Sequence, residues 1–264
     1  MGSEFGQGAY DVRFEWGPAA ARELKADTSV VVDVLSFSTA VTIAVERGMR
    51  VYPFRWRDRR AADFAAAHDA ALAVGRLEAT QPGSVAAPSL SPAGMLTCHF
   101  EPRIVLPSPN GSTIAAALQG TGSTVVLGCV RNAGAVARSL SSCLDEGRTV
   151  AVIAAGERWG NDDSLRPALE DQLGAGAILS SLRALDCTAA LSPESVGAAA
   201  LFDAFAAQLL ESMRDCVSGK ELTAKGFAAD VEVAAALDAS SVVPVLTDGS
   251  FGPAGRSPRL PCMH

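Results

Sequence analysis

The sequence predicts an α/β fold in which helices cover both faces of one largely parallel sheet. Two observations predict it. Short runs of β-branched and apolar residues alternate along the chain with longer, alanine-rich segments of helical periodicity. The chain also has 264 residues, 48% of them hydrophobic, which is enough apolar material for a large core. The length alone allows one or two domains.

Seven strands are expected. Residues 12–16 alternate between apolar and polar side chains, which is typical of a half-buried strand. Residues 29–33 (SVVVD) and 150–155 (VAVIAA) are continuous apolar runs, which are typical of strands buried on both faces. The other strands are predicted at 49–54, 104–106, 124–128 and 241–246.

Helices are expected between these strands. They are predicted at 36–47, 61–74, 112–118, 133–144, 165–185, 194–217 and 229–237. Ser and Thr residues near several of their starts, and Gly48 after the first, are ordinary capping residues. Pro, Ser and Gly residues predict a loop at 81–92, and the sequence PSPNG predicts a turn at 107–111.

The two ends of the chain are set apart from this fold. Residues 1–5 include Gly-Ser-Glu-Phe, which is typical of a cloning scar. Residues 252–264 are rich in Pro, Gly and Arg, and we expect a flexible tail there.

The composition argues against several classes of function. With 22 Lys and Arg against 29 Asp and Glu, the net charge is −7, so no nucleic-acid partner is expected. His68, His99 and His264 form no HExxH or HxH motif, and the six cysteines include no CxxC pair, so a His/Cys metal site is not expected. The cysteines are interpreted as reduced thiols of a cytoplasmic protein. No signal-peptide pattern and no apolar run of about 18 residues is seen, so no membrane partner is expected.

Four loops share one design: a buried strand, a short polar segment and then a helix of small residues. They contain residues 33–39, 108–113, 131–134 and 156–171. Loops of this kind lie at the carboxyl edge of a parallel sheet, where ligands bind. Helix N-termini offer backbone N–H groups to a phosphate or sulfonate there. Any one loop is explained by ordinary helix capping, but four together predict an anion site.

Four carboxylates at this edge are candidates for metal binding. Asp33 ends a run of three valines, where burying an unpaired carboxylate is costly, although it could also cap the next helix. Glu157 follows a strand and a glycine at the same edge. Asp171 falls on the apolar face of its helix, with Glu170 one position round. Together they could hold Mg²⁺. The alternative is a set of caps and of salt bridges to Arg131, Arg158 or Arg166.

Several sequence blocks in a fixed order carry a family resemblance. They are VVDVLSFSTAVTIAVERG (31–48), LPSPNGSTIA (106–115), LGCVRNAGAVA (127–137), IAAGE (153–157) with LEDQLGAGAI (169–178), and GFAADVEVAAALDASSVVPVL (226–246). Through them the chain resembles the 2-phosphosulfolactate phosphatase family. The resemblance implies a three-layer α/β/α fold with a mostly parallel or mixed sheet, in a single domain over residues 6–251. Polar positions of the family blocks are matched by Asp33, Asn110, Asn132, Glu157, Glu170 and Asp171.

One position departs from the family pattern. The family has an arginine after Asp-Val-Leu, whereas this chain has Ser36, followed by the bulky Phe37. An arginine at a helix start is a natural partner for phosphate or sulfonate. Arg131 and Arg158 are the candidate replacements.

The resemblance and the four loops together predict a magnesium-dependent phosphatase for a small anionic, phosphorylated substrate such as 2-phosphosulfolactate. Asp33, Glu157 and Asp171 are the predicted catalytic residues, and with Glu170 they are predicted to hold Mg²⁺. The predicted substrate-binding residues are Ser36, Ser38, Thr39, Asn110, Gly111, Ser112, Arg131, Asn132 and Arg158. Glu157 is the candidate to protonate the leaving oxygen, and Asp33 could be a ligand, a base or a nucleophile.

Two other functions stay open on the sequence. One is a non-catalytic anion- or metabolite-binding protein that kept the fold. The other is an enzyme that carries out a different reaction on a related anionic substrate. Helices rich in Ala and Gly are also compatible with a homodimer interface.

Overall fold

The computed structural model describes residues 6–56, 58–79, 87–185 and 188–254. The strands in this part of the chain are β1 (Val12–Trp16), β2 (Thr28–Val32), β3 (Arg50–Phe54), β4 (Ala71–Leu72), β5 (Arg103–Pro107), β6 (Thr124–Gly128), β7 (Val150–Ala154), β8 (Glu157–Arg158), β9 (Leu165–Arg166), β10 (Pro244–Thr247) and β11 (Ser250–Pro253). The first helices are α1 (Gly17–Glu23), α2 (Phe37–Glu46), α3 (Arg59–Ala67), α4 (Arg76–Ala79), α5 (Pro92–Thr97) and α6 (Gly111–Leu118). They are followed by η2 (Val130–Asn132), α7 (Ala133–Asp145), α8 (Leu169–Arg183), α9 (Pro193–Phe205), η3 (Ala206–Gln208), α10 (Leu209–Asp215), α11 (Val217–Ala224) and α12 (Ala228–Ala234).

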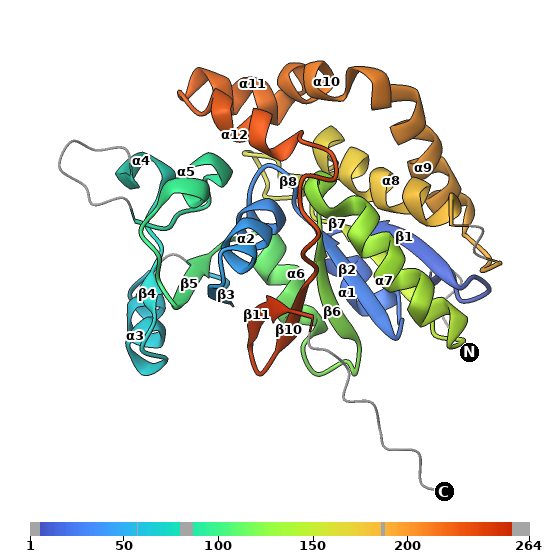
Figure 1. The fold of residues 1–264 in the computed structure, drawn as a ribbon, viewed down its shortest axis with the longest axis horizontal. Coiled ribbons are helices and arrows are strands. Elements are labelled where there is room, and N and C mark those ends of the chain that lie inside the picture. Colours follow the sequence, from blue (N-terminus) through green and yellow to red (C-terminus); the bar gives the residue numbers. More distant parts are fainter. Residues whose placement is uncertain (1–5, 57, 80–86, 186–187, 255–264) are drawn as a thin grey trace, which may run out of the picture.

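One large mixed sheet organises the molecule (Figure 1). In the described residues its strand order is β1-β7-β2-β6-β10-β11-β3-β5-β4. The strands β1, β7, β2 and β6 are parallel to one another, and so are β3, β5 and β4. The antiparallel hairpin β10–β11 joins these two groups, pairing with β6 on one side and β3 on the other. The predicted mostly parallel or mixed sheet is confirmed.

Strand β2 shows why the fold has three layers. Val30 and Val32 belong to the hydrophobic core that includes residues of α7 and α8, such as Ile178. Val31, which points the opposite way, belongs to a second core that includes residues of α2 and α6, such as Ile114. A strand alternates its side chains between two faces, so a continuous valine run requires a helix layer on each face. The predicted three-layer α/β/α fold is confirmed.

Helix α8 packs closely because of its glycines. A Cβ atom at Gly174 would lie 2.4 Å from Val34 Cγ2, and one at Gly176 would lie 2.3 Å from the carbonyl oxygen of Ala198. Glycine at these two positions therefore lets the helix backbone approach both the loop after β2 and helix α9. This contact brings the N-terminus of α8 to the carboxyl ends of the central strands.

The predicted helix at 61–74 is wrong in its second half. Helix α3 ends at Ala67, and Ala71–Leu72 form the edge strand β4 instead. Asp69 adopts a φ of +47°, which turns the chain out of the helix. The alanine-rich sequence gives no sign of this turn, because alanine favours a helix throughout. Residues 71–72 form a strand because they pair with β5.

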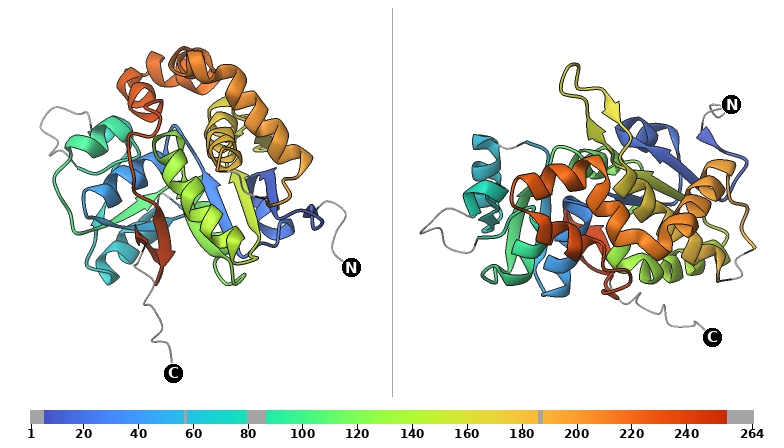
Figure 2. Two further views of the ribbon diagram at one scale, coloured as in Figure 1. Left: turned by 45° about the vertical axis from the view of Figure 1, so that its right-hand side comes forward. Right: turned by 90° about the horizontal axis from the view of Figure 1, so that it is seen from above.

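Two other helices begin or end differently from the prediction. Residues Leu165–Arg166 pair with β8 as strand β9, so α8 begins only at Leu169, after Pro167. The β8–β9 hairpin extends away from the body of the molecule (Figure 2). The predicted helix at 194–217 is divided into α9, η3 and α10, and α11 follows directly.

The end of the described chain is more ordered than the sequence predicts. The last strand was expected at 241–246, whereas β10 begins at Pro244 and is followed by a further strand, β11. Gly252 and Pro253, expected in the flexible tail, pair with β10. Residues 255–264, the proposed scar at 1–5 and the first half of the predicted loop at 81–92 lie outside the described residues.

One helical stretch has the length and composition of a membrane span. Residues Pro193–Asp215 have a mean hydropathy of 1.2, although no such run was expected from the sequence. Helices that pack in a protein core pass the same test; α9 packs on α8 through the close approach of Gly176 to Ala198, although only 28% of the apolar window is buried. Length and composition alone are therefore weak evidence for a membrane partner.

Candidate active site

Two carboxylates and an amide meet where β2, β5 and β7 end. Asp33 directly follows β2, and Asn110 lies in the loop after β5. Glu157 follows β7 after two intervening residues. The Asn110 side-chain amide donates to Glu157 Oε2 over 3.0 Å, and the Gly111 N–H donates to Asp33 Oδ2 over 3.0 Å. These bonds place both carboxylates at one pocket of about 390 Å³, lined by Asp33, Ser36, Arg55, Leu90, Pro107, Ser108, Pro109, Asn110 and Glu157.

Asp33 is held between two helix N-termini. Its Oδ1 accepts from the Phe37 N–H at the start of α2, and its Oδ2 accepts from the Gly111 N–H at the start of α6. It is 6% exposed. Burial raises its pKa to about 6, although both backbone N–H groups and the charge of Arg76 oppose the rise. The capping role that the sequence left open for Asp33 is therefore present, and the side chain also lines the pocket.

Glu157 has a pKa close to neutrality. Burial, followed by the charges of Asp33 and Glu170, raises the pKa to about 7, against the lowering effects of the Asn110 amide and the charge of Arg166. A carboxyl with this pKa exchanges its proton near pH 7, as a general acid or base requires.

Asp171 connects the loops that carry these two residues. Its Oδ1 accepts from the Val34 N–H over 2.7 Å, and its Oδ2 accepts from the Gly156 N–H over 2.9 Å. Burial, followed by the charges of Asp33 and Glu170, raises its pKa well above the ordinary value. Asp171 does not line the pocket that contains Asp33, and its two bonds fix the backbone of Val34 and Gly156, the residues next to Asp33 and Glu157.

Glu170 does not line the pocket that contains Asp33. It is 2% exposed, and its Oε2 lies 3.3 Å from Sγ of Cys216, whose thiol is the donor. Burial and the charge of Glu170 raise the pKa of Cys216 to about 12, so the thiol keeps its proton. Glu170 acts on the pocket through its charge, which contributes to the raised pKa values of its neighbours.

The carboxylates fit a cation in part. Among the described residues, no three His, Cys, Asp or Glu side chains are arranged to hold a metal ion by themselves. Magnesium, however, commonly uses one or two carboxylates and completes its shell with water and phosphate oxygens. Asp33 and Glu157 face one pocket, and their raised pKa values show that their negative charges are poorly compensated. A divalent cation would supply that compensation.

The predicted hydroxyl ligands mostly serve the loops themselves. Ser38 Oγ donates to the Asp33 carbonyl over 2.8 Å, and Thr39 Oγ1 donates to the Val34 carbonyl over 2.6 Å. Ser112 Oγ donates to the carbonyls of Ser108 and Phe54. These side chains are buried, so they shape the pocket from outside. Of the predicted substrate-binding residues, Ser36 and Asn110 line the pocket.

Asn132, Arg131 and Arg158 have other partners. The Asn132 amide donates to the carbonyls of Leu127 and Val242 and accepts from the Cys129 N–H. Arg131 donates to the Val233 carbonyl over 3.0 Å, and Arg158 donates to the Asp163 carbonyl over 2.8 Å. None of the three lines the pocket that contains Asp33.

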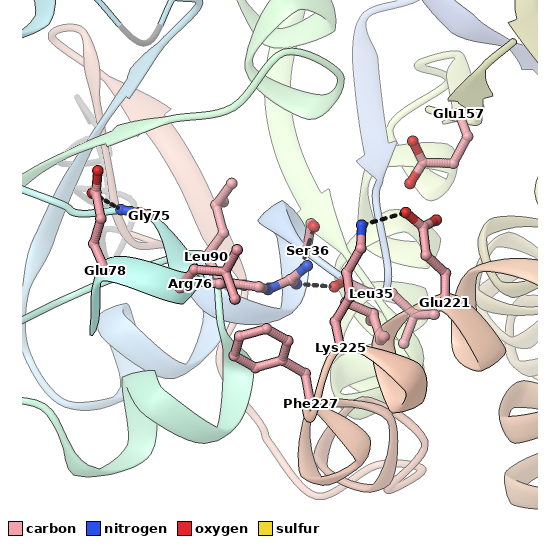
Figure 3. Close-up of a pocket in the computed structure, with 12 residues that line it drawn as sticks. Leu35, Ser36, Gly75, Arg76, Glu78, Leu90, Glu157, Glu221, Lys225 and Phe227 are labelled. Carbon is pink, nitrogen blue, oxygen red and sulfur yellow. Dashed lines mark hydrogen bonds and ion pairs between the residues drawn. The ribbon is translucent and has the colours of Figure 1, made fainter. Parts of the chain in front are cut away.

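Two arginines that the sequence analysis missed lie at the site instead. Arg55, directly after β3, lines the pocket with Asp33 and Glu157. Arg76 of α4 donates to the carbonyls of Leu35 and Leu90, and its Nη2 lies 3.2 Å from Ser36 Oγ (Figure 3). A guanidinium thus lies beside Ser36, although it does not come from Arg131 or Arg158. In the sequence, the arginine-rich run RWRDRR at residues 55–60 is a signal for Arg55, but it does not include Arg76.

A second cavity adjoins this pocket. It measures about 460 Å³ and shares Ser36, Leu90 and Glu157 with the smaller one (Figure 3). Arg76 and Lys225 lie on its walls. The site is therefore a carboxylate-lined pocket beside a second cavity, with three residues common to both.

Comparison with known proteins identifies the family. A family model described as 2-phosphosulpholactate phosphatase matches residues 18–249. The chain belongs to the 2-phosphosulpholactate phosphatase family. The resemblance inferred from the sequence blocks is thereby confirmed, and the residues matched to the family include all four carboxylates of the site.

A curated protein gives a second comparison. It is named "Probable 2-phosphosulfolactate phosphatase", from Gloeobacter violaceus, and is 32% identical to this chain over 142 residues. The alignment covers 54% of this chain and 54% of that protein. The chain thus matches about half the length of this relative, whereas the family model covers most of the chain.

Proposed function

We propose that this protein is a magnesium-dependent phosphatase that hydrolyses the phosphate monoester of a hydroxy acid to the free acid and phosphate. The observation that carries the proposal is the pairing of Asp33 with Glu157 at one pocket in a chain of the 2-phosphosulpholactate phosphatase family. The name of the relative from Gloeobacter violaceus supports substrates that resemble 2-phosphosulfolactate.

Asp33 and Arg55 are assigned to the neutralisation of the phosphoryl charge, Asp33 through the magnesium ion and Arg55 directly. Asp33 would hold the magnesium ion, which, when bound, neutralises phosphoryl oxygens and orients the attacking water. Arg55 lines the same pocket, and a guanidinium matches the planar spacing of phosphate oxygens. Because the cation compensates Asp33, a net-negative protein can still bind an anion at this position.

Glu157 is assigned to proton transfer. With a pKa of about 7, its carboxyl is partly protonated at neutral pH and can donate to the leaving oxygen. The Asn110 amide donates a hydrogen bond to Glu157 Oε2. Asp171 accepts one from the backbone N–H of Gly156, the residue before Glu157. Asp171 is thus assigned a positioning role and Glu170 an electrostatic one, both narrower than the roles that the sequence analysis gave them.

The test is phosphate release from a panel of 2-phospho-hydroxy acids, with Mg²⁺ and with EDTA. We expect metal-dependent turnover that falls at least about 100-fold in Asp33→Asn, since the ligand of the ion is lost. Asp145→Asn is the matched control, because Asp145 is exposed at the end of α7, outside the pocket.

The other outcomes distinguish the alternatives. Equal turnover by Asp33→Asn and wild type would reject the assignment of the site. Binding of phosphate esters without turnover of any of them would favour a non-catalytic anion-binding protein. Conversion of an ester without release of phosphate would favour a different reaction on a related substrate.

A further inference from the structure

Ser36 is the N-cap residue of helix α2, yet its side chain does not cap the helix. A serine at this position ordinarily accepts a hydrogen bond from a backbone N–H of the first turn. Ser36 makes no such bond, and the N–H of Phe37 is bonded to Asp33 Oδ1. Ser36 is half-buried and lines both the pocket that contains Asp33 and the adjoining cavity. Its hydroxyl is therefore available for a role other than capping.

Arg76 decides how the Ser36 hydroxyl can bond. Its Nη2 lies 3.2 Å from Ser36 Oγ (Figure 3). A guanidinium has only donors, so Ser36 Oγ is the acceptor in this bond and its own hydrogen is left for another partner. Among the described residues, no acceptor receives that hydrogen. A hydroxyl in this state suits an anion, because an anionic oxygen accepts hydrogen bonds and binds them strongly.

The guanidinium of Arg76 is itself held in place. Its Nε pairs with Asp230 over 3.2 Å, and the Asp230 side chain is 1% exposed. Its Nη2 also donates to the carbonyls of Leu35 and Leu90. These partners come from helix α12, the loop after β2 and the segment before α5, so three parts of the chain fix the guanidinium. Its charge also polarises the hydroxyl that it bonds, which makes Ser36 a stronger donor.

The pocket that Ser36 lines also contains the two groups assigned to the phosphoryl charge, Asp33 and Arg55. A donor on this wall therefore faces the place proposed for phosphate oxygens. The family pattern has an arginine at position 36, whereas here the guanidinium enters from α4 and a serine lies beside it. The chain thus combines a neutral donor at the pocket wall with a buried cation that orients it.

We propose that Ser36 donates its hydroxyl hydrogen to an oxygen of the substrate's phosphate group, and that Arg76 is the positioning residue that orients this hydroxyl. The proposal rests on the proposed function for the place of the phosphate. It adds a specific donor to the site and assigns Arg76 a role in binding besides its ion pair with Asp230.

The probe for this proposal is inorganic phosphate, whose dissociation constant is measured by calorimetry in the presence of Mg²⁺. Ser36→Ala should weaken phosphate binding about 10-fold or more, the size expected for one hydrogen bond to a charged group. Ser142→Ala is the matched control, since Ser142 is exposed on α7 and bonds only the Arg138 carbonyl there. Equal phosphate affinity of Ser36→Ala and wild type would overturn the proposal.

A second variant tests whether Arg76 acts through Ser36. Arg76→Lys keeps a positive charge near Asp230 but loses the planar fork, so it should weaken phosphate binding in the wild-type background. In the Ser36→Ala background the same change should alter the affinity by less than about twofold, since coupled residues are not additive. Equal losses in both backgrounds would show that Arg76 is merely structural and would overturn its assignment.

Two further comparisons complete this test. Arg183→Lys is the control for the substitution itself, because Arg183 pairs with Asp203 at an exposed position outside the pocket. If Arg76→Lys does not fold, Ser36→Ala alone decides the proposal, because its change lies at a half-buried loop residue.

Failure of the proposed function gives a different result. If no ester releases phosphate, yet phosphate binding still depends on Ser36, the proposed function fails and the Ser36–Arg76 assignment stands. If esters are hydrolysed with the same kcat/KM by Ser36→Ala and wild type, and phosphate affinity is also equal, only the assignment fails. A wild-type protein that binds no phosphate would overturn the assignment in either case.

Discussion

The Asn110 amide donates to the Glu157 carboxylate over 3.0 Å, and this bond joins the loop after β5 to the segment after β7. The two residues are far apart in the sequence and belong to the two different parallel groups of the sheet. Their contact shows that the carboxyl ends of both groups converge on one pocket. The bond also opposes the rise in the pKa of Glu157 that burial causes.

Replacing Asn110 should therefore change the pH dependence of turnover. In Asn110→Ala the pKa of Glu157 is expected to rise above its value of about 7, because a donor to the ionised form is lost. The limb of the kcat profile that reports the acid should move to higher pH. Loss of the oriented carboxyl should also reduce kcat about 10-fold or more, a part of what a general acid supplies.

The control for this measurement is Asn161→Ala, an exposed residue of the β8–β9 hairpin. Its pH profile should superimpose on that of the wild type. A profile of Asn110→Ala that does not shift would show that Glu157 is not the group that titrates in catalysis.

Asp171 should be more important for stability than its neighbour Glu170. In Asp171→Asn one oxygen becomes an NH₂ group that faces a backbone N–H, either that of Val34 or that of Gly156. An unsatisfied buried donor costs about 1–3 kcal/mol, so urea unfolding should report a loss of this order.

Glu170→Gln is the matched comparison for Asp171→Asn. The glutamine carbonyl can still accept from the Cys216 thiol, so a smaller loss of stability is expected. Equal free energies of unfolding for the two variants would contradict the positioning role of Asp171. If Asp171 acts only by position, its variant should also lose kcat without a shift in the pH profile.

The strands and layers could be predicted because they depend on local patterns. The valine run at 30–32 predicts a doubly buried strand, and the structure divides these side chains between two cores. The break at Asp69 could not be predicted, because nothing in the alanine-rich sequence outweighs helix propensity until pairing with β5 is known. Asp33 and Glu157 could be found because they follow strands closely, and Asp171 because it falls on the apolar face of its helix.

The arginines at the site could not be found in this way. Arg76 reaches Ser36 from a separate helix, a contact that depends on the path of the chain between β4 and α5. Loop hydroxyls such as Ser38 and Thr39 have the residue types of anion ligands, yet their hydrogens point to carbonyls of their own loop. Sequence shows which groups are present, but the burial of each decides whether it faces substrate or backbone.

The metal-free protein should lose stability as the pH rises from 3.8, the ordinary pKa of Asp33, to about 7, the raised pKa of Glu157. The pKa of Glu157 is raised from 4.5 to about 7, and that of Asp33 from 3.8 to about 6. Groups with raised pKa values stabilise the fold below their ordinary values, and this contribution is lost as the pH passes the folded-state values. Glu157→Gln removes one such group, so its stability relative to wild type should increase between pH 4.5 and pH 7.5.

Magnesium gives the complementary measurement. At pH 7.5 the ion should raise the melting temperature of the wild type, since it binds only the folded arrangement of carboxylates. Asp33→Asn should respond much less. A relative stability of Glu157→Gln that does not vary with pH would contradict the raised pKa of Glu157, whatever the ion does.

Arg76 and Asp230 form an ion pair whose loss should destabilise the protein strongly. Asp230 is 1% exposed and also accepts from the Ser91 hydroxyl and the Ala93 N–H, so its charge stays buried when the guanidinium is removed. Arg76→Met should therefore reduce the free energy of unfolding by about 3 kcal/mol or more, as for other broken buried pairs. Removing its charge should also raise the pKa of Asp33, which Arg76 lowers. The double variant Arg76→Met/Asp230→Asn should recover part of the stability, and additive losses in this cycle would show that the two side chains are not coupled.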